Sequence, residues 1–165
     1  MSPKVLIVMG SDSDCPVLEE AAKILEQFDI PYEMRIASAH RSPAKTASLV
    51  DGAAERGIQV IIAAAGLAAH LPGVVAAGTI LPVIGVPMGG GPLNGVDALY
   101  SIVQMPGGIP VATTAIGKPG AKNAALLAAQ ILALSNSGLG QQLRRYRDKM
   151  ASEVEEKDLK LQKRV

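Results

Sequence analysis

The chain has 165 residues, of which 48% are hydrophobic and 19% charged, so it can bury the core of one domain and is not a mainly disordered protein. Sixteen Lys and Arg stand against 15 Asp and Glu, and only 2% of the residues are aromatic, so neither nucleic acid nor an acidic membrane is expected as a partner. The single cysteine excludes an internal disulfide framework and a cysteine-rich zinc site.

Short apolar runs alternate with helical patterns along the first 134 residues. The run at 5–9 is continuous and ends at a glycine, which is typical of a strand buried on both faces. Further strands are predicted over residues 32–37, 60–65, 81–86 and 109–116. The helices predicted between them extend from a cap at Ser13 or Asp14 to Phe28, from a cap at Ser42 to Gly57, and over residues 71–77, 96–104 and 121–134.

Five strands that are each followed by a helix predict a parallel sheet covered on both faces. Right-handed crossovers leave few arrangements, and the flavodoxin-like order is favoured. We therefore expect a three-layer α/β/α fold in a single domain of residues 1–165. After Gly138 the composition becomes charged, so residues 138–165 are expected to be a C-terminal helical extension with a solvated face, its helix covering 139–164.

The first residues and the most apolar stretch bear on where the protein resides. The N-terminal sequence Met-Ser-Pro-Lys lacks the charged region, long apolar run and cleavage site of a signal peptide. The apolar stretch 60–86 is interrupted by glycine, histidine and proline residues, so it cannot form one membrane-spanning helix. A cytoplasmic protein without a membrane partner is expected.

Ligands of parallel α/β sheets bind beyond the carboxyl ends of the strands. This rule selects the loops 10–14, 38–43 and 66–73, which together hold both histidines and many hydroxyl groups. In the first loop, the hydroxyls of Ser11 and Ser13 and the N–H groups of a helix start could bind a phosphate. Asp14 could accept hydrogen bonds from paired sugar hydroxyls. An equally weighted alternative is that these residues only cap the helix.

His40 and Arg41 form the most distinctive pair in the second loop. Imidazole is the side chain best suited to move a proton near neutral pH, and guanidinium suits phosphate or carboxylate. A surface pair without function is the alternative. A lone histidine such as His70 is more often structural. Two histidines in separate loops, without a Glu or Cys beside them, do not predict a metal site.

Four motifs carry a resemblance to a known family. They are Met-Gly-Ser-Asp-Ser-Asp at 9–14, Ser-Ala-His-Arg-Ser-Pro at 38–43, Ala-Gly-Leu-Ala-Ala-His-Leu-Pro-Gly at 65–73 and Ser-Ile-Val-Gln-Met-Pro at 101–106. In this order they closely resemble the 5-(carboxyamino)imidazole ribonucleotide mutase family, the catalytic subunits of the carboxylase pair of purine biosynthesis. The similarity extends from Lys4 to Leu134.

The resemblance implies a flavodoxin-like subunit of a homo-octamer that needs no metal or other cofactor. It implies an isomerase that moves a carboxylate from the exocyclic nitrogen of a ribonucleotide to ring carbon 4, on substrate supplied by an ATP-dependent synthase. Two alternatives remain open: an enzyme that carboxylates aminoimidazole ribonucleotide directly with CO₂, and a non-catalytic nucleotide-binding module on the same fold.

The resemblance also implies roles for individual residues. The histidine matching His40 is the acid/base, the residues matching Ser11, Ser13 and Arg41 hold the phosphate, and the one matching Asp14 binds the ribose hydroxyls. The remaining expected pocket residues are Ser38, Ala65, Gly66 and His70, of which Ala65 and Gly66 would let backbone N–H groups approach CO₂ or the carboxylate. The chain departs from the family pattern at Leu67, Ser42 and residues 88–92, which bear on pocket shape and CO₂ retention.

Overall fold

The protein is described by a computed structural model that covers residues 2–163. Parallel strands and helices alternate from the start, as the sequence predicts. The elements are β1 (Val5–Met9), a single 3-10 turn η1 (Asp12–Asp14), α1 (Cys15–Gln27), β2 (Tyr32–Ile36), α2 (Pro43–Asp51), β3 (Val60–Ala65), α3 (Leu71–Ala77), β4 (Val83–Pro87), α4 (Val96–Val103), β5 (Ala112–Thr113), α5 (Lys118–Ala133) and α6 (Ser137–Gln162).

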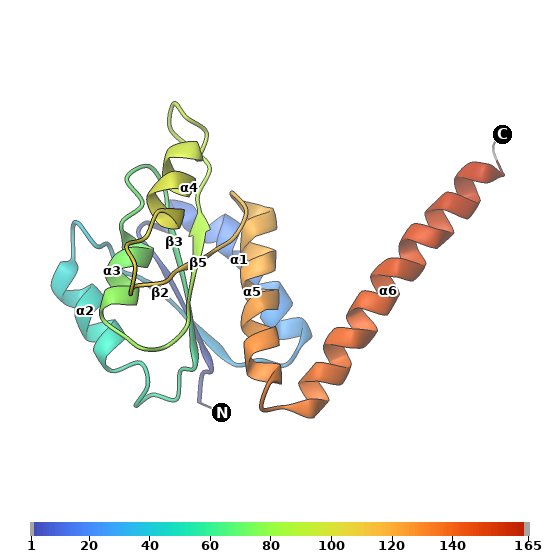
Figure 1. Cartoon of the computed structure of the whole chain (residues 1–165), viewed down its shortest axis with the longest axis horizontal. Helices are drawn as coiled ribbons and strands as arrows, with labels where there is room; N and C mark the ends of the chain where they lie inside the picture. Colours follow the sequence, from blue (N-terminus) through green and yellow to red (C-terminus); the bar gives the residue numbers. More distant parts are fainter. Residues whose placement is uncertain (1, 164–165) are drawn as a thin grey trace. The chain divides into compact units, whose positions relative to one another are not determined.

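The five strands form one parallel sheet in the order β2-β1-β3-β4-β5. This is the flavodoxin-like order, so the predicted fold class is confirmed. The central strands β1 and β3 are buried along their whole length, as their unbroken apolar sequences indicate. Because all strands are parallel, their carboxyl ends lie at one edge of the sheet, and the β1–α1, β2–α2 and β3–α3 loops meet there (Figure 1).

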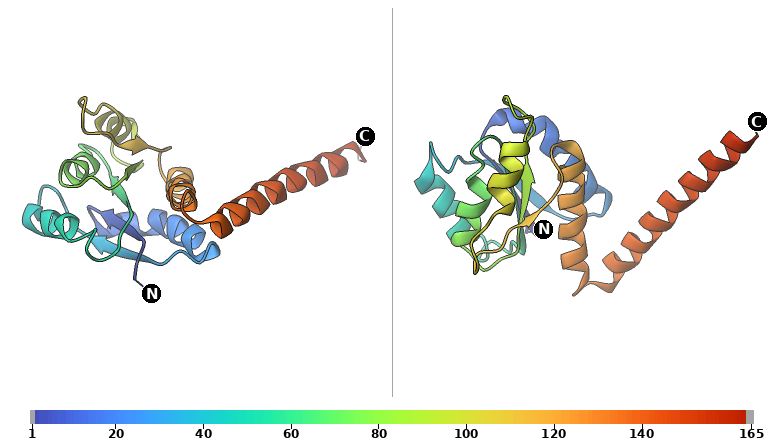
Figure 2. Two further views of the ribbon diagram at one scale, coloured as in Figure 1. Left: turned by 60° about the horizontal axis from the view of Figure 1, so that its bottom comes forward. Right: turned by 45° about the horizontal axis from the view of Figure 1, so that its top comes forward.

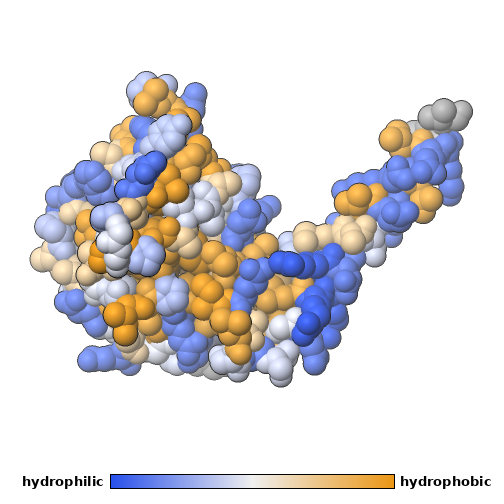
Figure 3. Space-filling view, in the orientation of Figure 1, coloured by the Kyte–Doolittle hydropathy of each residue, from blue (hydrophilic) through white to orange (hydrophobic). Residues whose placement is uncertain are grey.

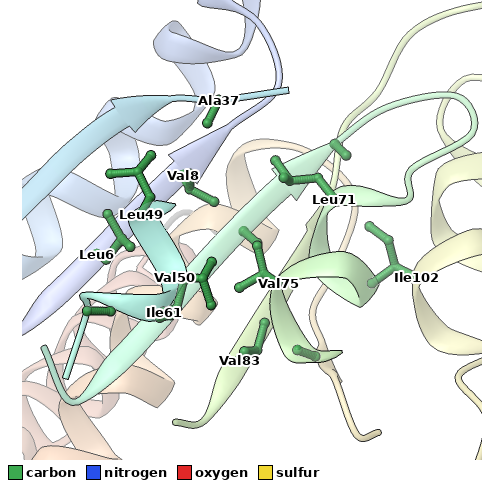
Figure 4. Packing of buried hydrophobic residues seen from close by; sticks show 14 of the residues in the cluster. Leu6, Val8, Ala37, Leu49, Val50, Ile61, Leu71, Val75, Val83 and Ile102 are labelled. Atoms are coloured by element: carbon green, nitrogen blue, oxygen red, sulfur yellow. The ribbon is translucent and has the colours of Figure 1, made fainter. Parts of the chain in front are cut away.

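Alternate side chains of the central strands enter cores on opposite faces of the sheet. One core joins the strands to α2, α3 and α4 (Figures 2 and 4); it includes Leu6, Val8, Ile61, Ala63, Leu49, Val50, Val75 and Ile102. On the other face lie α1 and the first part of α5. These two helices are also linked at the surface, because Glu20 of α1 lies 2.7 Å from Lys23 Nζ and 3.1 Å from Lys122 Nζ.

The fold requires glycine at two positions, one for close packing and one for its backbone conformation. In β4, a Cβ atom on Gly85 would collide with Ile102 of α4 and would lie 2.9 Å from Val111 Cγ1, so only glycine lets α4 pack this closely on the sheet. Gly57, which follows α2, has φ +92°, a left-handed conformation that suits glycine. It lies in a turn, whereas the sequence predicted that the helix would continue to this residue.

Several boundaries differ from the prediction, three of them for reasons that the structure shows. The helix α2 ends at Asp51 rather than Gly57, because the chain turns from Gly52 onward and re-enters the sheet at Val60. The strand β5 is two residues long rather than eight; Pro110 lacks an N–H donor, and only Ala112 and Thr113 are paired with β4. The strand β4 covers Val83–Pro87 rather than 81–86, and its last residue, Pro87, is paired with Ala65 of β3.

The contacts divide the chain within α5, into one unit up to Ala128 and a second unit from Ala129. The second unit contains α6, whose first N–H groups are capped by Asn136; its side chain accepts the Leu139 N–H at 3.1 Å. Hydrophilic residues cover most of the visible face of α6 (Figure 3). The exposed apolar residues of this helix include Met150, Val154, Leu159 and Leu161. The predicted helix end at Arg164 lies outside the described residues. Over residues 2–163, no helix combines the length and apolar character of a bilayer span.

Candidate active site

A cavity of about 420 Å³ lies at the carboxyl edge of the sheet, where the loops after β1, β2, β3 and β4 meet. Parallel α/β sheets bind their ligands in this position. Every residue that the sequence singled out for the site lines this cavity: Ser11, Ser13, Asp14, Ser38, His40, Arg41, Ala65, Gly66 and His70. The topology therefore brings together residues that are up to 59 positions apart in the chain.

The loop after β1 is organised by its hydroxyl groups. Ser11 caps η1, because its side chain accepts the Ser13 N–H at 3.3 Å. The Ser13 hydroxyl donates to Ser11 Oγ at 2.9 Å, and Ser11 donates to Asp12 Oδ1 at 3.1 Å. Asp14, one of the two caps that the sequence predicts for α1, occupies the N-cap position of that helix, although its side chain makes no capping hydrogen bond. Both serine hydroxyls line the cavity, and each could rotate to donate its hydrogen bond to a bound anion instead.

Asp14 occupies a half-buried position beside this serine pair. Burial raises the pKa of the Asp14 carboxyl above its ordinary value of 3.8, and the negative charge of Asp12 acts in the same direction. A hydrogen bond from the Ser11 backbone and the positive charge of Arg41 oppose that increase. A partly dehydrated carboxylate on the cavity wall is well suited to accept hydrogen bonds from ligand hydroxyls.

Arg41 links the first two loops. Its Nη2 donates to the carbonyl oxygen of Gly10 at 2.9 Å, and its backbone N–H donates to Ser38 Oγ at 3.1 Å. Ser38 in turn donates its own N–H to Ser42 Oγ at 2.9 Å. The guanidinium is therefore held beside the serines of the first loop, with further N–H groups available for an anion. Ser38 shapes the loop that presents Arg41.

The two histidines of the chain meet inside the cavity. His40 Nε2 and His70 Nδ1 are 2.7 Å apart, and the rings meet edge to face with their centroids 4.8 Å apart. One nitrogen of this pair must donate and the other accept. The interpretation of His70 as a structural histidine is incomplete, because its ring contacts the proposed acid/base directly. The described residues contain no group of three or more His, Cys, Asp or Glu that could hold a metal ion.

Comparison with known proteins matches this architecture. A family model described as AIR carboxylase matches residues 4–153. The chain belongs to the AIR carboxylase family. It is 58% identical over 160 residues to the N5-carboxyaminoimidazole ribonucleotide mutase of Pyrococcus horikoshii, covering 97% of this chain and 89% of that protein. It is 56% identical to the enzyme of the same name from Escherichia coli K12, covering 92% and 89% of the two chains.

The AIR carboxylase fold is also present in a solved structure of PurE from Treponema denticola, with a TM-score of 0.86 at 34% identity, covering 96% of this chain and 98% of that one. The resemblance inferred from the four motifs is therefore confirmed, and so is the prediction that the chain is an enzyme of this family.

Sequence reasoning linked residues 88–92 to the shape of the pocket but named none of them as a site residue. Met88, Gly89, Gly90 and Gly91, which follow β4, line the cavity, and Gly91 lies next to Leu67. The Met88 N–H donates to the carbonyl oxygen of Ala65 at 2.9 Å, so the loops after β3 and β4 lie side by side. The same rule about carboxyl ends selects this glycine-rich loop. It was noticed in the sequence only as a departure, because glycines carry no reactive side chain.

Proposed function

We propose that this protein acts in purine biosynthesis and converts N5-carboxyaminoimidazole ribonucleotide into its 4-carboxy isomer. The name of the relatives at 58% and 56% identity supports the substrate, and the polar cavity supports a ligand that carries a phosphate, a ribose and a carboxylate. The reaction is an intramolecular transfer, and we expect it to need no cofactor.

The substrate is placed by matching each of its groups to the wall that suits it. The phosphate lies against Ser11, Ser13 and Arg41, where hydroxyl donors and a guanidinium adjoin. The ribose hydroxyls donate to Asp14, whose carboxylate is poorly hydrated. The imidazole ring then extends toward His40.

Proton transfer by His40 carries the proposed chemistry. As the bond between the exocyclic nitrogen and the carboxyl carbon breaks, its electron pair stays on nitrogen, which takes a proton from His40, and CO₂ is released. Ring carbon 4 then attacks CO₂ with its own electron pair, and a new carbon–carbon bond forms. The neutral imidazole of His40 removes the proton from carbon 4, which restores the starting state of the enzyme. Enclosure of CO₂ beside the ring supplies the effective concentration for the second step.

The observation that carries this proposal is that His40 shares one cavity with the serines and Arg41 in a chain of this family. The decisive assay supplies each purified ribonucleotide separately, with and without bicarbonate. The proposal requires product from the carboxyamino compound without bicarbonate. Product only from aminoimidazole ribonucleotide and CO₂ would identify the direct carboxylase, which the description of the family model keeps as a second candidate. Binding without any turnover would identify the nucleotide-binding module.

We further infer a cytoplasmic homo-octamer that receives its substrate from an ATP-dependent synthase. Exposed large apolar side chains support burial between subunits; they include Ile80, Leu134, Tyr100 and Val154. Sedimentation at micromolar concentration tests the assembly, and a monomer would refute it.

A further inference from the structure

Leu67 combines two unfavourable features on the wall of the cavity. It has φ +55°, in the left-handed region that a side chain with a Cβ atom disfavours, and it is 55% exposed although it is large and apolar. The conformation is fixed by the turn that follows, in which the Ala69 N–H donates to the Leu67 carbonyl at 2.9 Å and the His70 N–H donates to that of Ala68 at 2.8 Å. Strained residues of this kind cluster at functional sites.

The Leu67 side chain reaches across to the glycine-rich loop. A Cβ atom built on Gly91 would collide with Leu67 Cδ2, so the leucine methyl group occupies the space that any side chain at 91 would need. Gly91 itself has φ +63°, which suits glycine. Deeper in the cavity the same two loops are joined by the Met88–Ala65 hydrogen bond. Leu67 therefore closes the gap between the loops at the rim, because it both lines the cavity and is partly exposed.

The chemistry of the captive intermediate explains why an apolar group suits this position. Free CO₂ is small and uncharged, so hydrogen bonds hold it weakly and its retention depends on a continuous wall. The adjoining wall is formed by Ala65 and Gly66, whose small size leaves room for CO₂ but offers little cover.

We propose that Leu67 is the residue that retains CO₂ between the two half-reactions, and that it thereby decides between intramolecular transfer and loss of CO₂ to solvent. This inference rests on the proposed function, because only a reaction with free CO₂ needs such a wall. The Leu67 side chain carries no polar group that could bind the phosphate, ribose or carboxylate, so its loss should affect retention more than ribonucleotide binding.

The test follows a ¹³C label in the carboxylate of the substrate while unlabelled bicarbonate is present. We expect wild-type enzyme to keep most of the label in the product. Leu67→Ala and Leu67→Gly are expected to lose label and release aminoimidazole ribonucleotide at least threefold more often per turnover, with KM changed less than twofold. Leu67→Met, which restores the reach of the side chain, is expected to retain label like the wild type.

A matched control is Leu93→Ala, because Leu93 has a similar exposure of 57% and lies in the β4–α4 connection with Gly91 but does not line the cavity. It is expected to retain label normally. Leu67→Gly relieves the left-handed strain, so its melting temperature should equal or exceed that of the wild type, and leakage then cannot reflect unfolding.

Equal label retention in wild type, Leu67→Ala and Leu67→Gly would overturn the inference and leave the proposed function intact. Equal leakage from the Leu93→Ala control would also overturn it. Wild-type enzyme that forms no labelled product would refute the proposed function, and the inference with it.

Discussion

His40 Nε2 lies 2.7 Å from His70 Nδ1, although the two residues are 30 positions apart and come from different loops. In a hydrogen bond between two imidazoles, one ring nitrogen donates and the other accepts. The tautomer of His70 is therefore linked to that of His40. If His40 is the proposed acid/base, His70 is a positioning residue that selects its tautomer.

The first prediction concerns replacement of His40, the proposed acid/base. His40→Asn keeps a polar side chain but cannot transfer a proton, so turnover should fall by roughly 10²- to 10⁴-fold. Binding of the ribonucleotide should stay within a few-fold of wild type, because the proposed phosphate and ribose contacts are made by other residues of the cavity. Calorimetric titration with product measures the second effect. Turnover near the wild-type rate would remove His40 from its assigned role.

The second prediction concerns His70, the hydrogen-bond partner of His40, whose replacement should affect kcat without a loss of substrate binding. His70→Ala leaves the correct tautomer of His40 unsupported, so kcat should fall by about tenfold or more while KM changes little. His70→Asn, whose amide can still hydrogen-bond with His40, should recover part of the loss. Steady-state kinetics across pH would separate the roles. A raised KM with unchanged kcat would mean that His70 only contacts substrate.

The third prediction concerns the phosphate. Arg41→Ala removes the guanidinium and its bond to the Gly10 carbonyl, and one charge-assisted hydrogen bond is worth about 1.5–3 kcal/mol. Affinity for the ribonucleotide should fall roughly 10- to 100-fold, as measured by equilibrium binding. The matching nucleoside, which lacks the phosphate, is the control ligand. If both ligands lose affinity equally, Arg41 does not bind the phosphate.

The fourth prediction is that the Asp14 carboxylate lowers the stability of the folded protein at neutral pH while it strengthens ribonucleotide binding. Its pKa is raised in the folded protein, chiefly by burial, so the ionised carboxylate opposes folding at neutral pH. That opposition disappears as the pH falls below the ordinary value of 3.8, where the group is protonated in both states. Asp14→Asn should therefore be more stable than wild type near pH 7, and the difference should vanish below about pH 4 in urea titrations. The same variant should bind ribonucleotide less tightly.

The fifth prediction is that Glu20 makes the stability of the folded protein depend on pH in the opposite direction. Hydrogen bonds from Lys23 and Lys122 lower the pKa of Glu20 to about 2. Its contribution to stability is therefore complete above the ordinary value of 4.5 and is lost as the pH falls toward about 2. Glu20→Gln should lower the melting temperature slightly at pH 7 and not at pH 2. Added salt should shrink the neutral-pH difference, since salt screens ion pairs that solvent can reach and the two lysine partners are exposed. A difference that persists at pH 2 would contradict this account.

The sequence was sufficient for the fold and for the location of the cavity, because both follow from simple rules. The unbroken apolar runs at 5–9 and 60–65 require strands with two covered faces, and parallel strands then gather their carboxyl ends at one edge. That is why residues chosen loop by loop all line a single cavity.

Other features depended on geometry that no spacing encodes. The contact between His40 and His70 requires particular side-chain orientations on two loops. The early end of α2 and the short β5 reflect tertiary competition for backbone partners, which local propensity does not describe. The sequence relates residues 88–92 to pocket shape but does not assign Gly89, Gly90 and Gly91 to the cavity wall, because glycines carry no side chain whose chemistry could indicate a site.

The absent methyl group of Gly85 has a consequence for any attempt to redesign this enzyme. Gly85 lets α4 lie close to the sheet, and α4 directly follows the loop that holds the glycine wall. A larger residue at 85 would lift that helix and displace the wall with it. The width of the cavity therefore depends on Gly85, a core position that does not line it. Mutagenesis libraries confined to the cavity lining would leave this position unexplored.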